Sequence, residues 1–269
     1  MFSLFKPRSV LVGSDLDFQI ETYKYLMKYF GGESFYTKTK LVLPTDEFFP
    51  DSVSSEDEIA SKTFHQVKKH SGMCLWPCQL IAQEPDPNRH LGGTLLIRNA
   101  PSLPRCTYSL GEEGAEITFN PNLLRNPVMM VALFANRLAF YLTQELTESP
   151  PGGWSNLGYA NDITAVFLGF GIFSVNSVFN FQQFSDGEII GWMSERNGCL
   201  SDVELLFALA IFCKLKGINP VVAASHIKPA LRKIFYNCIK QIDANEDFLS
   251  EIESVEFVGD QYHKHPRFS

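Results

Sequence analysis

The chain has little positive charge to offer a polyanion. Its 269 residues include 23 lysines and arginines against 30 aspartates and glutamates, a formal net charge of −7. Nucleic acids and anionic membrane surfaces bind basic patches, and no cluster of basic residues interleaved with aromatic ones occurs in this sequence. We therefore exclude nucleic acid and membrane from the expected partners.

Export and membrane-spanning signals are also missing. The first 15 residues lack the basic start, the long apolar stretch and the cleavage site of a secretory signal. The longest apolar runs, residues 128–142 and 163–175, are shorter than the roughly 20 residues that span a bilayer. Six cysteines without regular spacing, in a chain too long to need a disulfide framework, favour a reducing environment. Together these absences predict a cytoplasmic protein.

Recognisable metal, redox and phosphate motifs are absent as well. Cys74 and Cys78 in "CLWPC" are four apart, which is neither the redox C-x-x-C spacing nor half of a zinc site, because no second pair follows. We expect two buried structural thiols on one face of a strand. His263 and His265 are expected at the surface, and no G-x-S-x-G element or phosphate loop occurs. No cofactor is predicted.

Hydrophobic periodicity divides the chain into a mixed amino-terminal half and a helical carboxy-terminal half. Asn126 followed by Pro127 marks a helix start, and Ser201 with Glu204 forms a capping-box pattern. The predicted elements are helices at 15–30, 55–70, 127–148, 156–179, 201–217 and 226–242, and strands at 38–44, 74–84, 92–100 and 114–121.

These elements predict one α+β domain over residues 1–245, followed by an acidic and polar tail at 246–269. The amino-terminal half contributes a small β-sheet, and the carboxy-terminal half contributes the helices. Two helices, around 128–142 and 163–175, are apolar on nearly every side. A helix of that kind is central rather than superficial, so we expect both to be buried.

A polar pair interrupts the first of these buried helices. Thirteen of the fifteen residues from Val128 to Leu142 are apolar, and the exceptions are Asn136 and Arg137. A guanidinium keeps its charge, so Arg137 either extends along its stem to the surface or meets an anion inside. Asp162 is the single acidic residue between Glu148 and Asp186, and it opens the second apolar helix. We therefore expect Asp162 to contact Arg137 or Asn136.

This layout resembles the gluzincin type of zinc metallopeptidase over roughly residues 115–240. A strand ("EITF") precedes a helix with two special positions four apart, and a loop leads to a second helix with another such pair. The family's first helix carries His-Glu-x-x-His, two zinc ligands around a general base. Its second helix carries Glu-x-x-x-Asp, in which the glutamate is the third ligand and the aspartate orients a histidine.

Every ligand position of that pattern is changed in this sequence. In "NRLAF", Asn136 and Phe140 stand where the two histidines would be, and Arg137 replaces the general base. In "GYAND", Gly158 stands in place of the ligand glutamate, while Asp162 matches the family's aspartate. Catalytic zinc needs three protein ligands and an open position for water, so the resemblance implies a zincin-like fold without zinc or peptide hydrolysis.

The resemblance thus implies a catalytically inactive, metallopeptidase-like protein with a binding or regulatory role. Its partner would be a peptide or protein along the former substrate edge, next to the strand that ends at Phe119. In this interpretation Arg137 supplies the positive charge that zinc would have given, which pairs Asp162. Two alternatives stay open: an enzyme of another chemistry that uses Asp162 in the same cleft, and a purely structural partner that sequesters an active relative.

Overall fold

The chain folds into helices that enclose a core, with a small β-sheet on one side. The computed structural model describes residues 9–50, 56–84, 106–111, 114–186, 189–196, 198–245, 247–259 and 267; residues 56, 57, 179–186 and 189–196 are described by their backbone alone. The predicted α+β class is confirmed, and helices account for most of the described elements.

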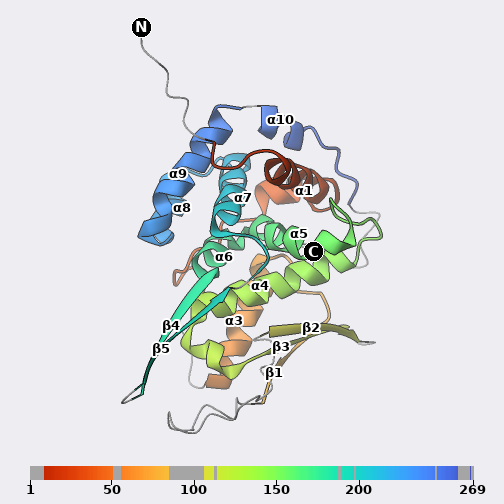
Figure 1. Cartoon of the computed structure of the whole chain (residues 1–269). Helices are drawn as coiled ribbons and strands as arrows, with labels where there is room; N and C mark the ends of the chain where they lie inside the picture. Colours follow the sequence, from red (N-terminus) through yellow and green to blue (C-terminus); the bar gives the residue numbers. More distant parts are fainter. Residues whose placement is uncertain are drawn as a thin grey trace.

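Helix α4 is the centre of the fold (Figure 1). It packs against α3, against the sheet and against the consecutive segments α5, η4 and α6, which together form the second buried helical stretch. Both apolar helices of the sequence are therefore central, as predicted. The bounds are α3 Glu56–His70, α4 Pro127–Gln144, α5 Leu157–Ala165, the π-helix η4 Val166–Phe170, and α6 Gly171–Ser177.

The remaining helices cover the side of α5 and α6 that faces away from the sheet (Figure 1). Helix α7 packs on α6 and α9, and α1 crosses α5 and α7. Short 3-10 turns precede α4 and α5. The bounds are α1 Ser14–Phe30, α2 Gly32–Thr37, η2 Pro121–Arg125, η3 Trp154–Asn156, α7 Asp202–Leu215, α8 Pro220–His226, α9 Pro229–Asp243, and α10 Asp247–Glu253.

Both helix starts predicted from capping residues are confirmed. The Asn126 side chain accepts a hydrogen bond from the Met129 amide, and Pro127 begins α4. Ser201 and Glu204 bond reciprocally at the start of α7. These caps satisfy amide groups that have no partner within the helix, so each helix begins at the residue that its sequence indicates.

A three-stranded sheet lies against α4, in the order β1-β3-β2. Strand β3 (Gly114–Phe119) is parallel to β1 (Cys78–Ala82) and antiparallel to β2 (Cys106–Gly111). The strand predicted at 114–121 is confirmed, and the one predicted at 92–100 lies outside the described residues. Residues 38–44 form no strand; instead the Val42 amide donates to the Gly169 carbonyl at 2.9 Å.

Strands β4 (Phe179–Asp186) and β5 (Ile189–Arg196) form a separate antiparallel hairpin that extends away from the helices (Figure 1). It connects α6 to the loop before α7. Neither of these strands was among the predicted elements. Residues 198–201 return the chain from the hairpin to α7, and this return passes beside α5.

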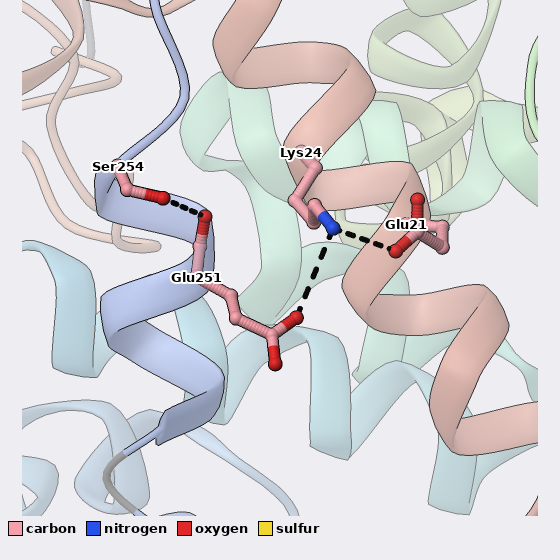
Figure 2. A network of polar contacts seen from close by, with 4 residues as sticks. All are labelled: Glu21, Lys24, Glu251 and Ser254. Carbon is pink, nitrogen blue, oxygen red and sulfur yellow. Dashed lines mark hydrogen bonds and ion pairs between the residues drawn. The ribbon is translucent and has the colours of Figure 1, made fainter.

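The segment predicted as a tail, 246–269, includes α10, which packs on α1. Ile252 is completely buried, and the Val258 amide donates to the Lys28 carbonyl at 2.8 Å. Figure 2 shows Lys24 of α1 between Glu21 on its own helix, at 2.8 Å, and Glu251 on α10, at 3.7 Å. These exposed pairs contribute little energy, so the buried Ile252 is the main attachment.

Among the described residues, one helical stretch, Trp154–Ser177, is long and apolar enough to cross a membrane by length and composition. However, 83% of its most apolar window is buried inside the protein. The stretch is therefore a core element of the fold.

Gly169 interrupts this stretch, and its replacement tests how tightly the core is packed around it. Its φ is +101°, and a Cβ there would collide with the Lys40 carbonyl oxygen. We expect Gly169→Ala to lower the free energy of unfolding by about 2–4 kcal/mol, because left-handed strain and overpacking add. Gly217→Ala is the control: its φ is +60° with open space around it, so strain alone costs about 1–2 kcal/mol. If urea denaturation shows the same loss of unfolding free energy for both variants, the predicted collision at Gly169 is contradicted.

Candidate functional site

The Asp162 carboxylate is the centre of the candidate site. Asp162 lies on α5 and is 6% exposed. Its Oδ2 atom accepts hydrogen bonds from the backbone amides of Cys199, at 2.6 Å, and Leu200, at 2.9 Å. Its Oδ1 atom accepts one from Asn136 Nδ2, at 2.9 Å. A buried carboxylate is thus satisfied by three donors from two other segments of the chain.

Asn136 connects α4 to α5 through both its side chain and its backbone. In addition to its bond to Asp162, its carbonyl oxygen accepts a hydrogen bond from Asn161 Nδ2 at 3.0 Å. Asn161 is 3% exposed, so this pair of bonds lies inside the helix contact. The expected contact of Asp162 with the polar pair is therefore made by Asn136.

Arg137 does not form the expected ion pair with Asp162. No salt bridge joins it to a carboxylate of the described residues, and its Nε atom is buried without a hydrogen-bond partner. Its side chain is half-buried, and its charge opposes the rise in pKa that burial causes in Cys106 of β2. Arg137 therefore forms no direct ion pair with Asp162, whose oxygens both accept from amide donors, and its charge acts on this carboxylate from a greater distance. That Arg137 replaces the charge of a lost zinc ion stays a prediction.

Phe140 and Gly158 contact different elements. The Phe140 ring packs edge-to-face on Tyr108 of β2, with centroids 5.1 Å apart. Gly158, at the start of α5, faces the loop after the hairpin, and a Cβ there would lie 2.7 Å from Cys199 Sγ. Asp162 and Gly158 thus lie beside the return loop, Asn136 reaches Asp162 from α4, and Phe140 contacts the edge strand β2.

Burial governs the protonation of Asp162. Desolvation raises the pKa of this carboxyl above its ordinary value. The amides of Leu200 and Cys199, the Asn136 side chain and the more distant charge of Arg137 all lower it again, without cancelling the effect of burial. Beside the site, burial also raises the pKa of the Cys106 thiol to about 12, and Arg137 opposes that shift.

The donor set is poor for a metal. Asn136, Arg137, Phe140 and Gly158 provide no imidazole, thiolate or carboxylate, and the Asp162 oxygens are already occupied by N–H donors. Across the described residues, no three His, Cys, Asp or Glu side chains are grouped to hold a metal ion. That the protein binds no zinc stays a prediction, because it concerns the protein in solution.

The expectation for "CLWPC" is wrong in one respect. Cys78 begins β1 and is partly buried, but Cys74 is exposed in the turn before the strand. Pro77 follows Trp76, which is 1% exposed, so the motif anchors the turn through the indole rather than through its thiols.

Two parts of the site were missed in the sequence. The backbone donors of Cys199 and Leu200 leave no side-chain signature, although the Gly198 before them has a φ of +89° and its Cβ would meet the Asp162 carboxylate. The edge strand β2 could have been found, since Cys106, Tyr108 and Leu110 alternate with polar residues.

A separate cavity of about 420 Å³ opens at the amino end of α4, between Asn126, Asn176 and His226. None of the five sequence-predicted site residues lines it. Asn176 closes one side by donating to the His226 carbonyl and accepting from the Lys228 amide. This cavity is therefore distinct from the Asp162 site.

Comparison with protein-family models, with curated proteins and with solved structures finds no match for this chain.

The Asp162 network gives a direct test. We expect Asp162→Ala to lower the free energy of unfolding by about 3 kcal/mol, because Asn136 and two backbone amides lose their acceptor in a buried place. Glu148→Ala is the matched control: that carboxylate also accepts hydrogen bonds but is 51% exposed, and we expect about 1 kcal/mol or less. A loss below about 0.5 kcal/mol for Asp162→Ala in urea denaturation would refute the network's structural role.

The raised pKa of Asp162 predicts how stability varies with pH. Between its unfolded value, near 3.9, and its higher folded value, the unfolded chain binds fewer protons than the folded one. The unfolding free energy therefore falls as pH rises through this window. Measured against Asp162→Asn, which does not titrate, the wild type should lose stability from pH 3.5 to 7. A relative gain over the same range would mean that the three donors dominate burial.

Proposed function

We propose that this chain is a zincin-like relative of the gluzincin metallopeptidases that binds an extended peptide or protein segment and does not hydrolyse it. The order of strand β3, helix α4 and helix α5 supports this proposal, as does the contact between Asn136 and Asp162 at the positions that correspond to a zinc ligand and its orienting aspartate. Position 158, where the third ligand would be, is blocked by the Cys199 sulfur.

The observation that carries the proposal is the full use of Asp162 as an acceptor. A general acid or base must exchange a proton with a substrate, so at least one of its oxygens must be accessible. Asp162 is 6% exposed, and both of its oxygens are directed to N–H groups of the protein. This arrangement suits a carboxylate that holds the fold together, and it disfavours the alternative of an enzyme that uses Asp162.

The binding surface that we propose is the outer edge of β2. The sequence placed a partner next to the strand ending at Phe119, but that strand, β3, is central and both of its edges are occupied by β1 and β2. Within the part of the chain that the structure describes, the unpaired edge beside α4 belongs to β2, which ends in the exposed Leu110 and Gly111. An unpaired edge strand binds an extended segment by continuing the sheet. A sequestering role would use the same edge with a whole protein as partner.

Hydrogen exchange tests this surface. Acetylated hexapeptides from a randomised library are captured on the immobilised full-length protein, identified, resynthesised and added in excess. We expect amide exchange to slow in β2 (Cys106–Gly111), because outward-facing amides gain acceptors from the peptide. Strand β1 (Cys78–Ala82), the other edge of the same sheet, is the internal control and should be unchanged.

Three outcomes would contradict the proposal: capture of no peptide, protection at β1 rather than β2, or cleavage of the bound peptides. Metal analysis adds an independent criterion. One equivalent of zinc retained after dialysis would show that the metal site is not lost.

A further inference from the structure

The cavity at the amino end of α4 is lined by three segments of the chain that contain no acidic residue. These segments are the start of α4, the end of α6 and the turn between α8 and α9. The chain has 30 aspartates and glutamates, yet none occurs at residues 117–144, 163–185 or 205–242, which include the three segments. The residues that line the cavity therefore bring no negative charge to it.

Positive charge is concentrated in the third of these segments. Residues 205–242 contain six lysines and arginines, and Lys228 is an exposed residue of the cavity lining. Arg232 donates hydrogen bonds to the carbonyl of Ile227, at 3.1 Å, and to that of Ser225, at 3.2 Å. These bonds hold a guanidinium at the turn between α8 and α9. An anionic ligand is therefore favoured in the cavity beside this turn.

Two further groups in the lining keep hydrogen-bonding capacity for a ligand. The Asn126 side-chain oxygen caps α4 by accepting from the Met129 amide at 3.1 Å, and its Nδ2 group has no acceptor among the described residues. The His226 ring is partly buried and likewise bonds to none of the residues that the structure describes. Together with the Lys228 ammonium group, these side chains supply separate donors from two segments of the chain.

Such a donor set suits a phosphate group better than a carboxylate. The planar fork of an arginine matches a carboxylate best, and no arginine of the described residues lines the cavity. A phosphate monoester carries a charge of about −1.5 to −2 at neutral pH and has three oxygens that accept from separate donors. Lysine pairs with such a group as a point charge.

The cavity is also larger than a phosphate group needs. Its volume of about 420 Å³ lies within the range of small-molecule pockets, roughly 300–1,000 Å³. The lining includes the apolar side chains of Val128, Met129 and Ile227, which can pack on the carbon part of a ligand. A ligand with both an anionic and an apolar part therefore uses more of the cavity than a single ion does.

Asn176 holds two of the three segments together without a ligand. Its Nδ2 group donates to the His226 carbonyl at 2.8 Å, and its Oδ1 atom accepts from the Lys228 amide at 3.0 Å. These bonds join the end of α6 to the turn between α8 and α9. A wall that is already in place lowers the entropy cost of binding.

We propose that this cavity binds a small organic molecule through a phosphate monoester. Lys228, His226 and Asn126 bind the phosphate oxygens, and the apolar side chains of the lining pack on the carbon part. The site is separate from the edge of β2, so this inference goes beyond the peptide-binding role proposed above and does not depend on it.

Isothermal titration calorimetry on the full-length protein tests the ligand class with three probes: phenyl phosphate, phenol and inorganic phosphate. Phenyl phosphate combines the anionic and the apolar part, whereas each of the other two has one part alone. We expect phenyl phosphate to bind about tenfold more tightly, or more, than either of them. Its affinity should fall as salt is added, because the attraction between charges is screened.

Variants locate the site. Lys228→Gln should weaken phenyl phosphate binding about fivefold or more, because the dianion loses a charged donor. Lys233→Gln is the matched control: it removes an exposed lysine of α9 that is not part of the described cavity lining, and affinity should not change. Val128→Trp fills the cavity from the start of α4 and should abolish binding. Circular dichroism confirms that each variant is folded, and Lys228→Gln, at an exposed position, leaves the core intact.

Each alternative outcome overturns the proposal. Absence of phenyl phosphate binding at millimolar concentration would show that the cavity takes no such ligand. Equal affinity for phenol would make it an apolar site, and equal affinity for inorganic phosphate would remove the role of the carbon part. Undiminished binding by Lys228→Gln, or an equal loss in Lys233→Gln, would place the recognition of the phosphate outside the cavity.

Discussion

The hydrogen-bonded carboxylate of Asp162 is the constraint on which the centre of this fold depends. It joins α5 to α4 through Asn136, and it joins α5 to the return loop through the amides of Cys199 and Leu200. The capping box of α7 begins at the next residue, Ser201, so the same carboxylate holds the segment that leads directly into α7. Burying a charge is costly unless its oxygens are satisfied, and here each donor belongs to an element that must be held in place.

Amide donors and a metal stabilise such a centre in different ways. A zinc ion holds helices together by coordinate bonds and contributes its binding energy to folding. In this chain, neutral donors satisfy the carboxylate, and the Cys199 sulfur fills the space beside Gly158. Because the donors are neutral, Asp162 needs no cation of its own. The charge of Arg137 adds a weaker, longer-range attraction that lowers the pKa of this carboxyl.

Local signals in the sequence account for the parts of the fold that could be predicted. The starts of α4 and α7 follow from side-chain caps, and burial of the two apolar helices follows from their lack of a polar face. The Asn136–Asp162 contact could be predicted because polar side chains in two adjacent apolar helices have few other polar groups to bond to. By contrast, the π-helix contains Gly169 at positive φ against the Lys40 carbonyl, and the Cys199 and Leu200 donors are backbone amides. Both features depend on tertiary contacts that no residue type indicates. The alternation of apolar and polar residues in β2, however, could have been recognised in the sequence.

The guanidinium of Arg137 acts on the core by its charge rather than by a direct ion pair. Asn136 and two backbone amides complete the carboxylate network of Asp162, so Arg137 is not needed there as a donor. Its positive charge still lowers the pKa of Asp162 and of the Cys106 thiol, in both cases against the larger effect of burial. The charge of Arg137 thus favours the ionised form of two buried acidic groups, while neutral N–H donors fix the geometry of the carboxylate.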